Sequence, residues 1–286
     1  MKFIDSHVHY INEDPWEYIE TLLKLMDEHD IEQAVLFGVQ GDPSCSDAGV
    51  WHVAQKYPER IIPFACSVRC EYPRDAEVFL NYLGEGEFWK GVGEIYLDIG
   101  PHGPAAKYLD RSGCERSYPY YCPPDKSDNA VYQEVFLHCA KRGLPVLVHC
   151  LNIDTMKHLL DKFPTTTFIW GHVDCGLMHD EVIPLLASYR NLYCEIGIEF
   201  RYEANALLNG PAEKWLIDRF IGWQAAAKIY PERIIWGSDI FEWRDLDKEY
   251  YRNFIRVWEM FCDPLATNIR EHIGQKNLLR IIGKAA

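Results

Sequence analysis

The chain repeats one pattern eight times along its 286 residues: a short apolar run followed by an amphipathic segment. The apolar runs are Phe3–Ile4, Ala34–Phe37, Ile61–Val68, Val92–Leu97, Val146–Val148, Thr167–Trp170, Leu192–Ile196 and Ile234–Trp236. The segments with apolar residues at helical spacing are 16–26, 47–57, 75–83, 129–142, 153–163, 178–188, 212–229 and 246–260. Eight strand–helix units predict a parallel sheet closed into an α/β (β/α)8 TIM barrel. An open doubly wound sheet is the alternative, but no Gly-x-Gly-x-x-Gly follows the first run.

One stretch interrupts this rhythm after the fourth strand. Between Gly100 and Asn129 the chain is rich in Pro, Gly, Tyr and charged residues. Because the loops after barrel strands surround the active site, we predict a single domain, 1–286, with an inserted active-site loop at 100–128. A plain surface insertion is the alternative. After Met260, two short helical pieces near 264–273 and 275–283 are expected to pack outside the barrel or close its bottom.

Composition narrows the class of protein. Hydrophobic residues make up 48% and charged residues 25%, which is typical of a soluble globular protein. We expect no membrane segment and no secretion signal, because no long apolar stretch is present. The ten cysteines form no Cys-x-x-Cys pair, which favours a reduced, cytoplasmic protein. A net charge of −14 disfavours nucleic acid as a partner. We expect a small-molecule substrate, and leave self-association open.

Polar side chains follow the predicted strands at their carboxyl ends. His7 and His9 end the first strand, where alternation predicts that both face one side and Ser6 faces the other. The further candidates are Glu94 within the fourth strand, His149 after the fifth, His172 after the sixth and Asp239 after the eighth. In a barrel these side chains converge on one mouth. Imidazoles and carboxylates without thiolates suit Zn²⁺, and also Mn²⁺.

Each candidate also has a purely structural interpretation. An exposed His pair is commonly solvated, and a His after a strand often makes a hydrogen bond. Glu94 could pair with a Lys or Arg, and Asp239 could cap the next helix. The joint pattern favours a metal site, because six candidates fall on five strands with no such set at the opposite ends.

The sequence is similar to the amidohydrolase superfamily in the motif DSHVH, in the single His after strands five and six, and in GSD after strand eight. RIIWGSDIF and KNLLRIIG resemble its amidohydrolase-related branch, which includes lactone hydrolases and metal-dependent decarboxylases, and GEIYLD resembles GEIGLD of TatD-like hydrolases. The resemblance implies that His7, His9 and Asp239 bind one metal ion. Glu94 then bridges to a second ion completed by His149 and His172. With one ion, His172 is instead free for chemistry, so one or two ions remain open.

These interpretations predict a metal-dependent hydrolase acting on a C–O or C–N bond of a lactone, ester or amide. A divalent cation lowers the pKa of a bound water from 15.7 to about 7, which supplies the nucleophile. Asp239 is expected to pass the proton to the leaving group, and His172 to bind metal or polarise the carbonyl. The predicted substrate contacts are Tyr96 and three arginines expected in the loops after strands three, seven and eight: Arg69, Arg201 and Arg244. The alternatives are a decarboxylase of an aromatic or muconate-type acid and a non-enzymatic acid- or sugar-binding barrel.

Overall fold

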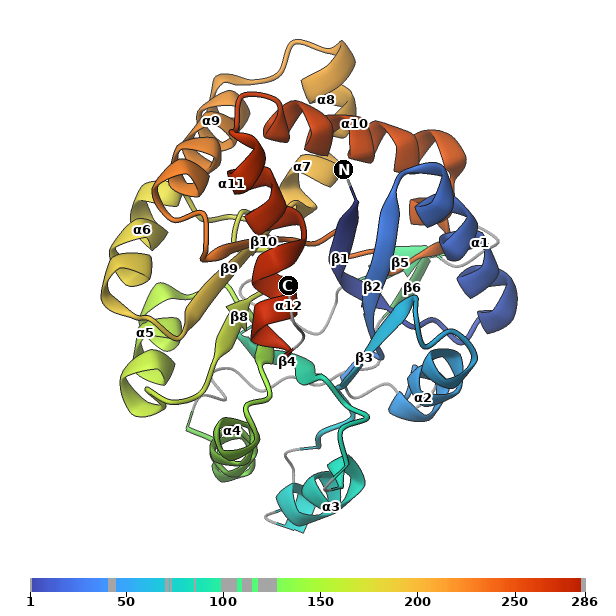
Figure 1. The fold of residues 1–286 in the computed structure, drawn as a ribbon, viewed down its shortest axis with the longest axis vertical. Coiled ribbons are helices and arrows are strands. Elements are labelled where there is room, and N and C mark those ends of the chain that lie inside the picture. Colours follow the sequence, from blue (N-terminus) through green and yellow to red (C-terminus); the bar gives the residue numbers. More distant parts are fainter. Residues whose placement is uncertain are drawn as a thin grey trace.

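Eight parallel strands form a nearly closed barrel in the computed structural model, which confirms the predicted (β/α)8 fold (Figure 1). The structure describes residues 2–40, 45–69, 72, 74–84, 86–98, 107–109, 115–117 and 128–283. In barrel order the strands are β1 (Phe3–His9), β2 (Ile31–Phe37), β3 (Ile61–Ala65), β4 (Gly91–Asp98), β7 (Val146–Cys150), β8 (Phe168–Trp170), β9 (Leu192–Ile196) and β10 (Ile234–Trp236). Each predicted apolar run contains or overlaps one of these strands.

Helices surround the strands and follow the predicted segments closely. They are α1 (Pro15–Glu28), α2 (Asp47–Lys56), α3 (Arg74–Leu83), α4 (Ala130–Arg142), α5 (Ile153–Lys162), α6 (His179–Ser188), α7 (Ile198–Tyr202), α8 (Ala204–Asn209), α9 (Lys214–Ile229) and α10 (Lys248–Cys262), with a 3₁₀ turn η2 (Trp243–Leu246) before α10. Among these described helices, none is both long and apolar enough to cross a bilayer. The short helices α7 and α8 were not expected, because helices of five and six residues are too short to show apolar residues at helical spacing.

Side-chain caps start several helices directly after a strand or turn. Asn152 accepts hydrogen bonds from the backbone N–H groups of Asp154 and Thr155 at the start of α5. Asp247 does the same for the first turn of α10. These caps satisfy backbone donors that have no partner within the helix, so they set where each helix begins.

The barrel closes where β10 meets β1. A bridge joins Val8 and Ile240, and the His9 N–H donates to the Ile240 carbonyl at 2.8 Å. The Asp5 carboxylate accepts from the backbone N–H of Ser238 at 2.9 Å and from that of His7 at 3.1 Å. This seam therefore depends on individual contacts, in place of the regular ladder that joins the other neighbouring strands.

Apolar side chains fill the barrel from below. Ile4, Phe37, Phe64 and Ile169 form an inner cluster, and Leu278 packs into it. Leu278 belongs to the C-terminal segment α11 (Thr267–Glu271), η3 (His272–Lys276, a π-helix) and α12 (Asn277–Ile281). Figure 1 shows α12 in front of the barrel centre, so this segment closes the bottom, as one of the two predicted placements requires.

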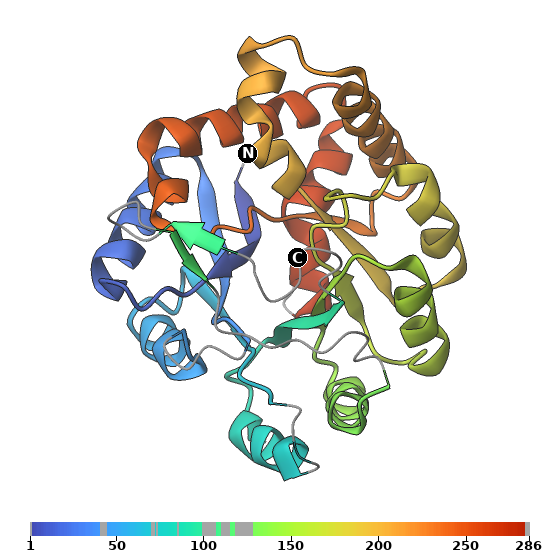
Figure 2. The same cartoon turned by 180° about the vertical axis from the view of Figure 1, so that it is seen from behind.

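The predicted insertion contains a small hairpin. Strands β5 (Lys107–Leu109) and β6 (Glu115–Ser117) pair antiparallel. Figure 2, seen from the side opposite to α12, places this hairpin in front of the barrel, on the side of the strand carboxyl ends. Residues 99–106, 110–114 and 118–127 lie outside the described part of the chain. The role of 100–128 as an active-site cover therefore remains a prediction.

Candidate metal centre

Three predicted ligands from the two sides of the barrel seam meet at the mouth. The His7 and His9 Nε2 atoms lie 3.3 Å apart, and each lies 3.2 Å from the Asp239 Oδ1. All three side chains are almost fully buried. Ligand atoms around a tetrahedral Zn²⁺ with bonds of about 2.0–2.1 Å lie about 3.3 Å from one another, so the spacing fits a bound cation.

The hydrogen bonds of the two imidazoles orient them for such a cation. The His7 Nδ1 lies 2.6 Å from the Glu195 Oε2, and the His9 Nδ1 lies 3.0 Å from the Gly38 carbonyl oxygen. Since both contacts place the ring proton on Nδ1, each neutral imidazole presents a lone pair at Nε2. Two lone pairs and a carboxylate oxygen then face one another, an arrangement that a cation stabilises.

Glu94 connects this group to a second one. Its Oε2 lies 3.6 Å from the His7 Nε2 and 3.5 Å from the His9 Nε2. Its Oε1 lies 2.7 Å from the His172 Nε2 and 3.3 Å from the His149 Nδ1, and these two ring nitrogens lie 3.0 Å apart. The two oxygens of one buried carboxylate thus contact two imidazole pairs, as the predicted bridging role requires. The structure brings all six predicted ligands together.

Glu195, on β9, is a site residue that the sequence analysis missed. Besides contacting His7, it accepts a hydrogen bond from the Ser6 hydroxyl at 2.5 Å and another from the His172 N–H at 3.2 Å. The prediction that Ser6 faces away from His7 is therefore wrong. The pairing of β1 with β2 shifts register between Asp5 and Val8, and such a bulge breaks the alternation of side chains. The signal that could have found Glu195 is a lone carboxylate within the apolar run LYCEI.

Two of the site residues have a backbone conformation that is rare for side chains with a Cβ. His172 has φ of 36° and Asp239 has φ of 51°, both in the left-handed region. Such a conformation costs of order 1–3 kcal/mol and is found preferentially at functional sites. For Asp239, it places the carboxylate directly after β10 and toward β1.

Burial and opposite charges act against each other at this site. Burial lowers the pKa of the His7 imidazole, but the surrounding carboxylates outweigh it and hold that pKa well above 6.5. Burial raises the pKa of the Asp239 and Glu94 carboxyls, and the neighbouring imidazoles, His7 first, more than reverse this. Without a cation the site therefore favours carboxylates and a protonated His7, so a metal ion competes with a proton.

The family profile described as "Amidohydrolase" matches residues 4–283. The chain belongs to the amidohydrolase family. This confirms the resemblance drawn from DSHVH, the two strand-end histidines and GSD, while the TatD-like role of Glu94 stays a prediction. A search of curated proteins finds no match to this amidohydrolase.

Solved structures show the same fold at low sequence identity. An amidohydrolase from Burkholderia multivorans with bound zinc is 14% identical, covers 100% of both chains and has a TM-score of 0.66. A dihydroorotase from Campylobacter jejuni is 14% identical over 100% of this chain and 84% of its own, with a TM-score of 0.60. A 2,6-dihydroxybenzoate decarboxylase from Rhizobium is 16% identical over 99% of both chains, with a TM-score of 0.50. The neighbours of this amidohydrolase thus span different reactions on one scaffold.

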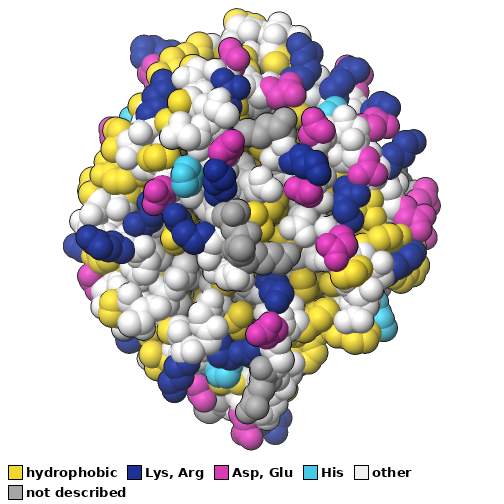
Figure 3. Space-filling model, in the orientation of Figure 1, with side chains coloured by type: hydrophobic (Ala, Val, Ile, Leu, Met, Phe, Trp, Pro, Cys, Tyr) yellow, Lys and Arg dark blue, Asp and Glu magenta, His cyan; other side chains and the backbone are white. Residues whose placement is uncertain are grey.

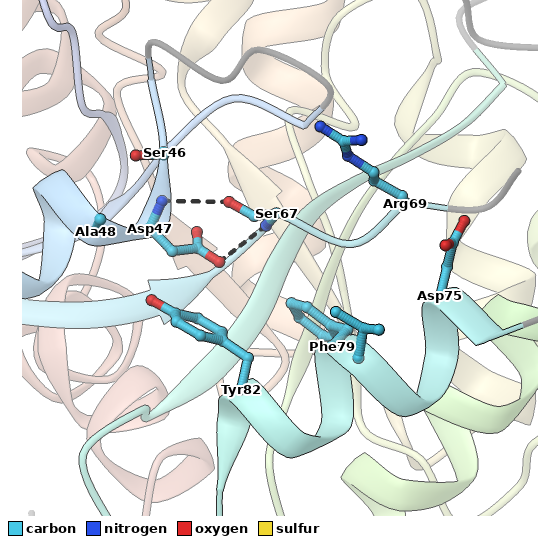
Figure 4. A pocket seen from close by; sticks show the side chains of 9 residues that line it. Ser46, Asp47, Ala48, Ser67, Arg69, Asp75, Phe79 and Tyr82 are labelled. Atoms are coloured by element: carbon cyan, nitrogen blue, oxygen red, sulfur yellow. Dashed lines mark hydrogen bonds between the residues drawn. The ribbon is translucent and has the colours of Figure 1, made fainter. Parts of the chain in front are cut away.

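The four predicted substrate contacts lie at different places in this amidohydrolase. The Tyr96 ring lies 5.2 Å from the His149 ring, beside the ligand cluster. Arg69 is exposed and lines a cavity of about 320 Å³ between the start of α2 and the length of α3, together with Phe79 and Tyr82 (Figure 4). Arg244, on η2, is half-exposed and pairs with Glu242 at 2.5 Å.

Arg201 is enclosed within the protein, and it lies in helix α7, not in the expected loop. Its Nη1 pairs with the Asp245 Oδ1 at 2.6 Å, and its guanidinium lies over the rings of Tyr202 and Phe241. The side chain is 1% exposed. The pair joins the segment after β9 to the segment after β10, so it connects two walls of the mouth.

Proposed function

We propose that this amidohydrolase is a metal-dependent hydrolase that cleaves a C–O or C–N bond of a small lactone, ester or amide. The observation that carries the proposal is the Glu94 carboxylate between two imidazole pairs, because this donor set suits a pair of divalent cations. The proposed ion is Zn²⁺, with Mn²⁺ as the second choice. Bound there, the cations would activate a water molecule and polarise the scissile carbonyl.

The protein's own residues supply orientation and proton transfer. Asp239 is the proposed proton carrier, because its Oδ1 faces the His7–His9 pair and the lowered pKa of its carboxyl keeps it ionised. His172 is proposed as a ligand, since its Nε2 and the His149 Nδ1 both face the Glu94 carboxylate. Tyr96 beside His149 is the proposed substrate contact nearest the ligands.

The protein is proposed to work as a cytoplasmic enzyme on a small molecule. No disulfide joins the cysteines within the described residues, which fits a reducing compartment. The barrel mouth, lined by imidazoles and carboxylates, suits a small polar substrate.

A metal-content measurement with matched variants tests the two-ion arrangement. The purified protein should hold two equivalents of metal. His9→Ala should remove the ion held with His7 and Asp239, whereas His149→Ala should remove the ion on the other side of Glu94. Circular dichroism spectra control for folding. A single ion lost equally in both variants would contradict the bridging role of Glu94.

A substrate panel then separates the reaction classes. Lactones, esters, amides and aromatic carboxylic acids are incubated with the metal-loaded enzyme, and acid production and CO₂ release are followed in parallel. Hydrolysis that disappears on chelation and returns with Zn²⁺ supports the proposal. Metal-dependent CO₂ release without hydrolysis would replace it by the decarboxylase alternative.

A further inference from the structure

The cavity lined by Arg69 lies on the flank of the barrel, and no step of the proposed reaction uses it. It lies between the start of α2, the segment after β3 and helix α3, and we call it the α2–α3 cavity (Figure 4). None of the candidate metal ligands is among its described lining residues. Its volume of about 320 Å³ is in the range of cavities that enclose a small organic molecule.

The walls of the α2–α3 cavity are mostly apolar. Helix α3 contributes the rings of Phe79 and Tyr82 and the side chain of Val78, and α2 contributes Ala48. Val78 is 65% exposed and Tyr82 is 44% exposed, so apolar surface is open to solvent here. On the face seen in Figure 3, hydrophobic side chains are also exposed at the lower right, over α2 and α3. The hydrocarbon body of a ligand would remove apolar surface of these walls from water.

The acidic groups of the cavity are already engaged by the protein. The Asp47 carboxylate is 2% exposed and accepts hydrogen bonds from the backbone N–H groups of Cys66 at 2.8 Å and Ser67 at 2.9 Å. The Ser67 hydroxyl in turn accepts from the Asp47 N–H at 3.2 Å (Figure 4). The Asp75 carboxylate accepts from the Tyr72 N–H at 2.8 Å. Since the backbone occupies both carboxylates, neither is set up to hold a cationic ligand.

The polar groups that stay open toward the cavity can all donate hydrogen bonds. They are the Arg69 guanidinium and the hydroxyls of Ser46 and Tyr82, and none of them makes a side-chain hydrogen bond or an ion pair with a described residue. Burial and the Asp47 charge raise the pKa of the Tyr82 phenol, so it stays protonated at neutral pH. Figure 4 shows the Arg69 guanidinium well apart from the Asp75 carboxylate. An unpaired cation with hydroxyl donors beside apolar walls is complementary to an organic anion.

We propose that the α2–α3 cavity is an accessory site that binds a small organic carboxylate with an apolar body. Its carboxylate would face Arg69, since a guanidinium can donate two parallel hydrogen bonds to a carboxylate, and its body would lie against Val78 and Phe79. An inorganic anion would leave the apolar walls uncovered, and an apolar amine would bring its charge against Arg69. The site does not depend on the reaction at the metal centre, so it stands whether or not the proposed function holds.

Isothermal titration calorimetry on the metal-loaded full chain tests the site with three probes of similar shape, benzoate, benzamide and benzylamine. Benzoate should bind saturably, benzamide should bind at least about tenfold more weakly, and benzylamine more weakly still, because only benzoate makes a charge-assisted bond with Arg69. Arg69→Met should weaken benzoate binding by at least about tenfold for the same reason. Val78→Asp should also weaken it, because a carboxylate then replaces part of the apolar wall.

Matched variants on other helices control for charge and exposure. Arg256→Met on α10 makes the same change of charge as Arg69→Met, and Ile221→Asp on α9 matches Val78→Asp at a side chain that is 55% exposed. Both should bind benzoate as the wild-type protein does. Circular dichroism spectra check the folding of each variant.

Benzoate bound by a metal ion is distinguished by His9→Ala, which should lose any binding at the metal centre but keep the α2–α3 site. Benzoate binding that is unchanged in Arg69→Met would overturn the proposal, because the probe would then lie elsewhere. A preference for benzylamine would also overturn it, as would the absence of saturable benzoate binding to the wild-type protein.

Discussion

At the scale of single residues, Glu195 determines how the first imidazole is presented. Its carboxylate holds the His7 Nδ1 at 2.6 Å and is itself held by the Ser6 hydroxyl and the His172 N–H. Carboxylates that accept from the outer nitrogen of a metal-binding imidazole fix its tautomer and raise its basicity. Gly237 leaves room for this carboxylate, since a Cβ there would lie 2.6 Å from the Glu195 Oε1.

Glu195→Gln should lower the affinity for Zn²⁺ by about 10- to 100-fold, because an amide orients His7 poorly and adds no negative charge. Competition with a fluorescent chelator measures this affinity without any substrate. Ser6→Ala is the matched control, since it removes one hydrogen bond to the same carboxylate but leaves the His7 contact in place. Equal Zn²⁺ affinities in Glu195→Gln and wild-type protein would show that Glu195 does not support metal binding by His7.

The sequence analysis found the candidate ligands but not the residue that holds one of them in place. His7, His9, His149, His172 and Asp239 each end or follow a strand, where the fold alone brings polar side chains to the mouth. Glu195 contacts His7 from a different strand, β9, and the periodicity of the sequence does not reveal which strands lie close together in the barrel. Ser6 was misplaced because a bulge within a strand leaves no mark in the sequence.

At the scale of elements, the buried Arg201–Asp245 pair ties α7 to η2. Asp245 also accepts hydrogen bonds from the backbone N–H groups of Phe241 and Glu242. These contacts hold the turn that follows Asp239, so the pair supports one side of the candidate metal centre. Helix α7 was missed in the sequence because five residues show no helical period, and Arg201 was therefore expected in a loop.

Arg201→Met should reduce the free energy of unfolding by about 3–5 kcal/mol, because it leaves the Asp245 carboxylate buried and unpaired. Urea denaturation followed by circular dichroism measures the change. Arg201→Met combined with Asp245→Leu should recover part of the loss, as the charge is then removed from both sides. A single variant as stable as wild type would show that water enters freely around Asp245.

At the scale of the whole molecule, pH should act oppositely on the metal-free and metal-loaded protein. The pKa of His7 lies above its usual 6.5, so its contribution to stability is present below that value and is lost as pH rises. The lowered pKa values of Glu94 and Asp239 contribute stability above about pH 4 that is lost on acidification. The metal-free cluster is therefore best stabilised in mildly acidic solution.

Zn²⁺ bound at the proposed site would displace the proton on His7, so the rise in Tm on adding Zn²⁺ should grow between about pH 6 and pH 8. Differential scanning fluorimetry with and without Zn²⁺ measures this increment at each pH. His272, which lies near α12 and away from the cluster, offers a control variant, His272→Gln, that should keep the wild-type pH profile. An increment that is constant with pH would show that the ion binds without displacing a proton.

The candidate metal centre lies at the seam between the first and last barrel strands, so a bound ion would also affect the stability of the barrel. His7 and His9 come from β1, and Asp239 is the third residue after the end of β10. An ion held by these three side chains would cross-link the first barrel strand to the segment after the last one, at the one junction of the described barrel that relies on a bridge and a few side-chain contacts. Stripping the ion should therefore speed amide deuterium uptake at β1 and β10 while β7 and β8 keep their protection. An ion that takes part in catalysis would then also hold the two edge strands of the barrel together.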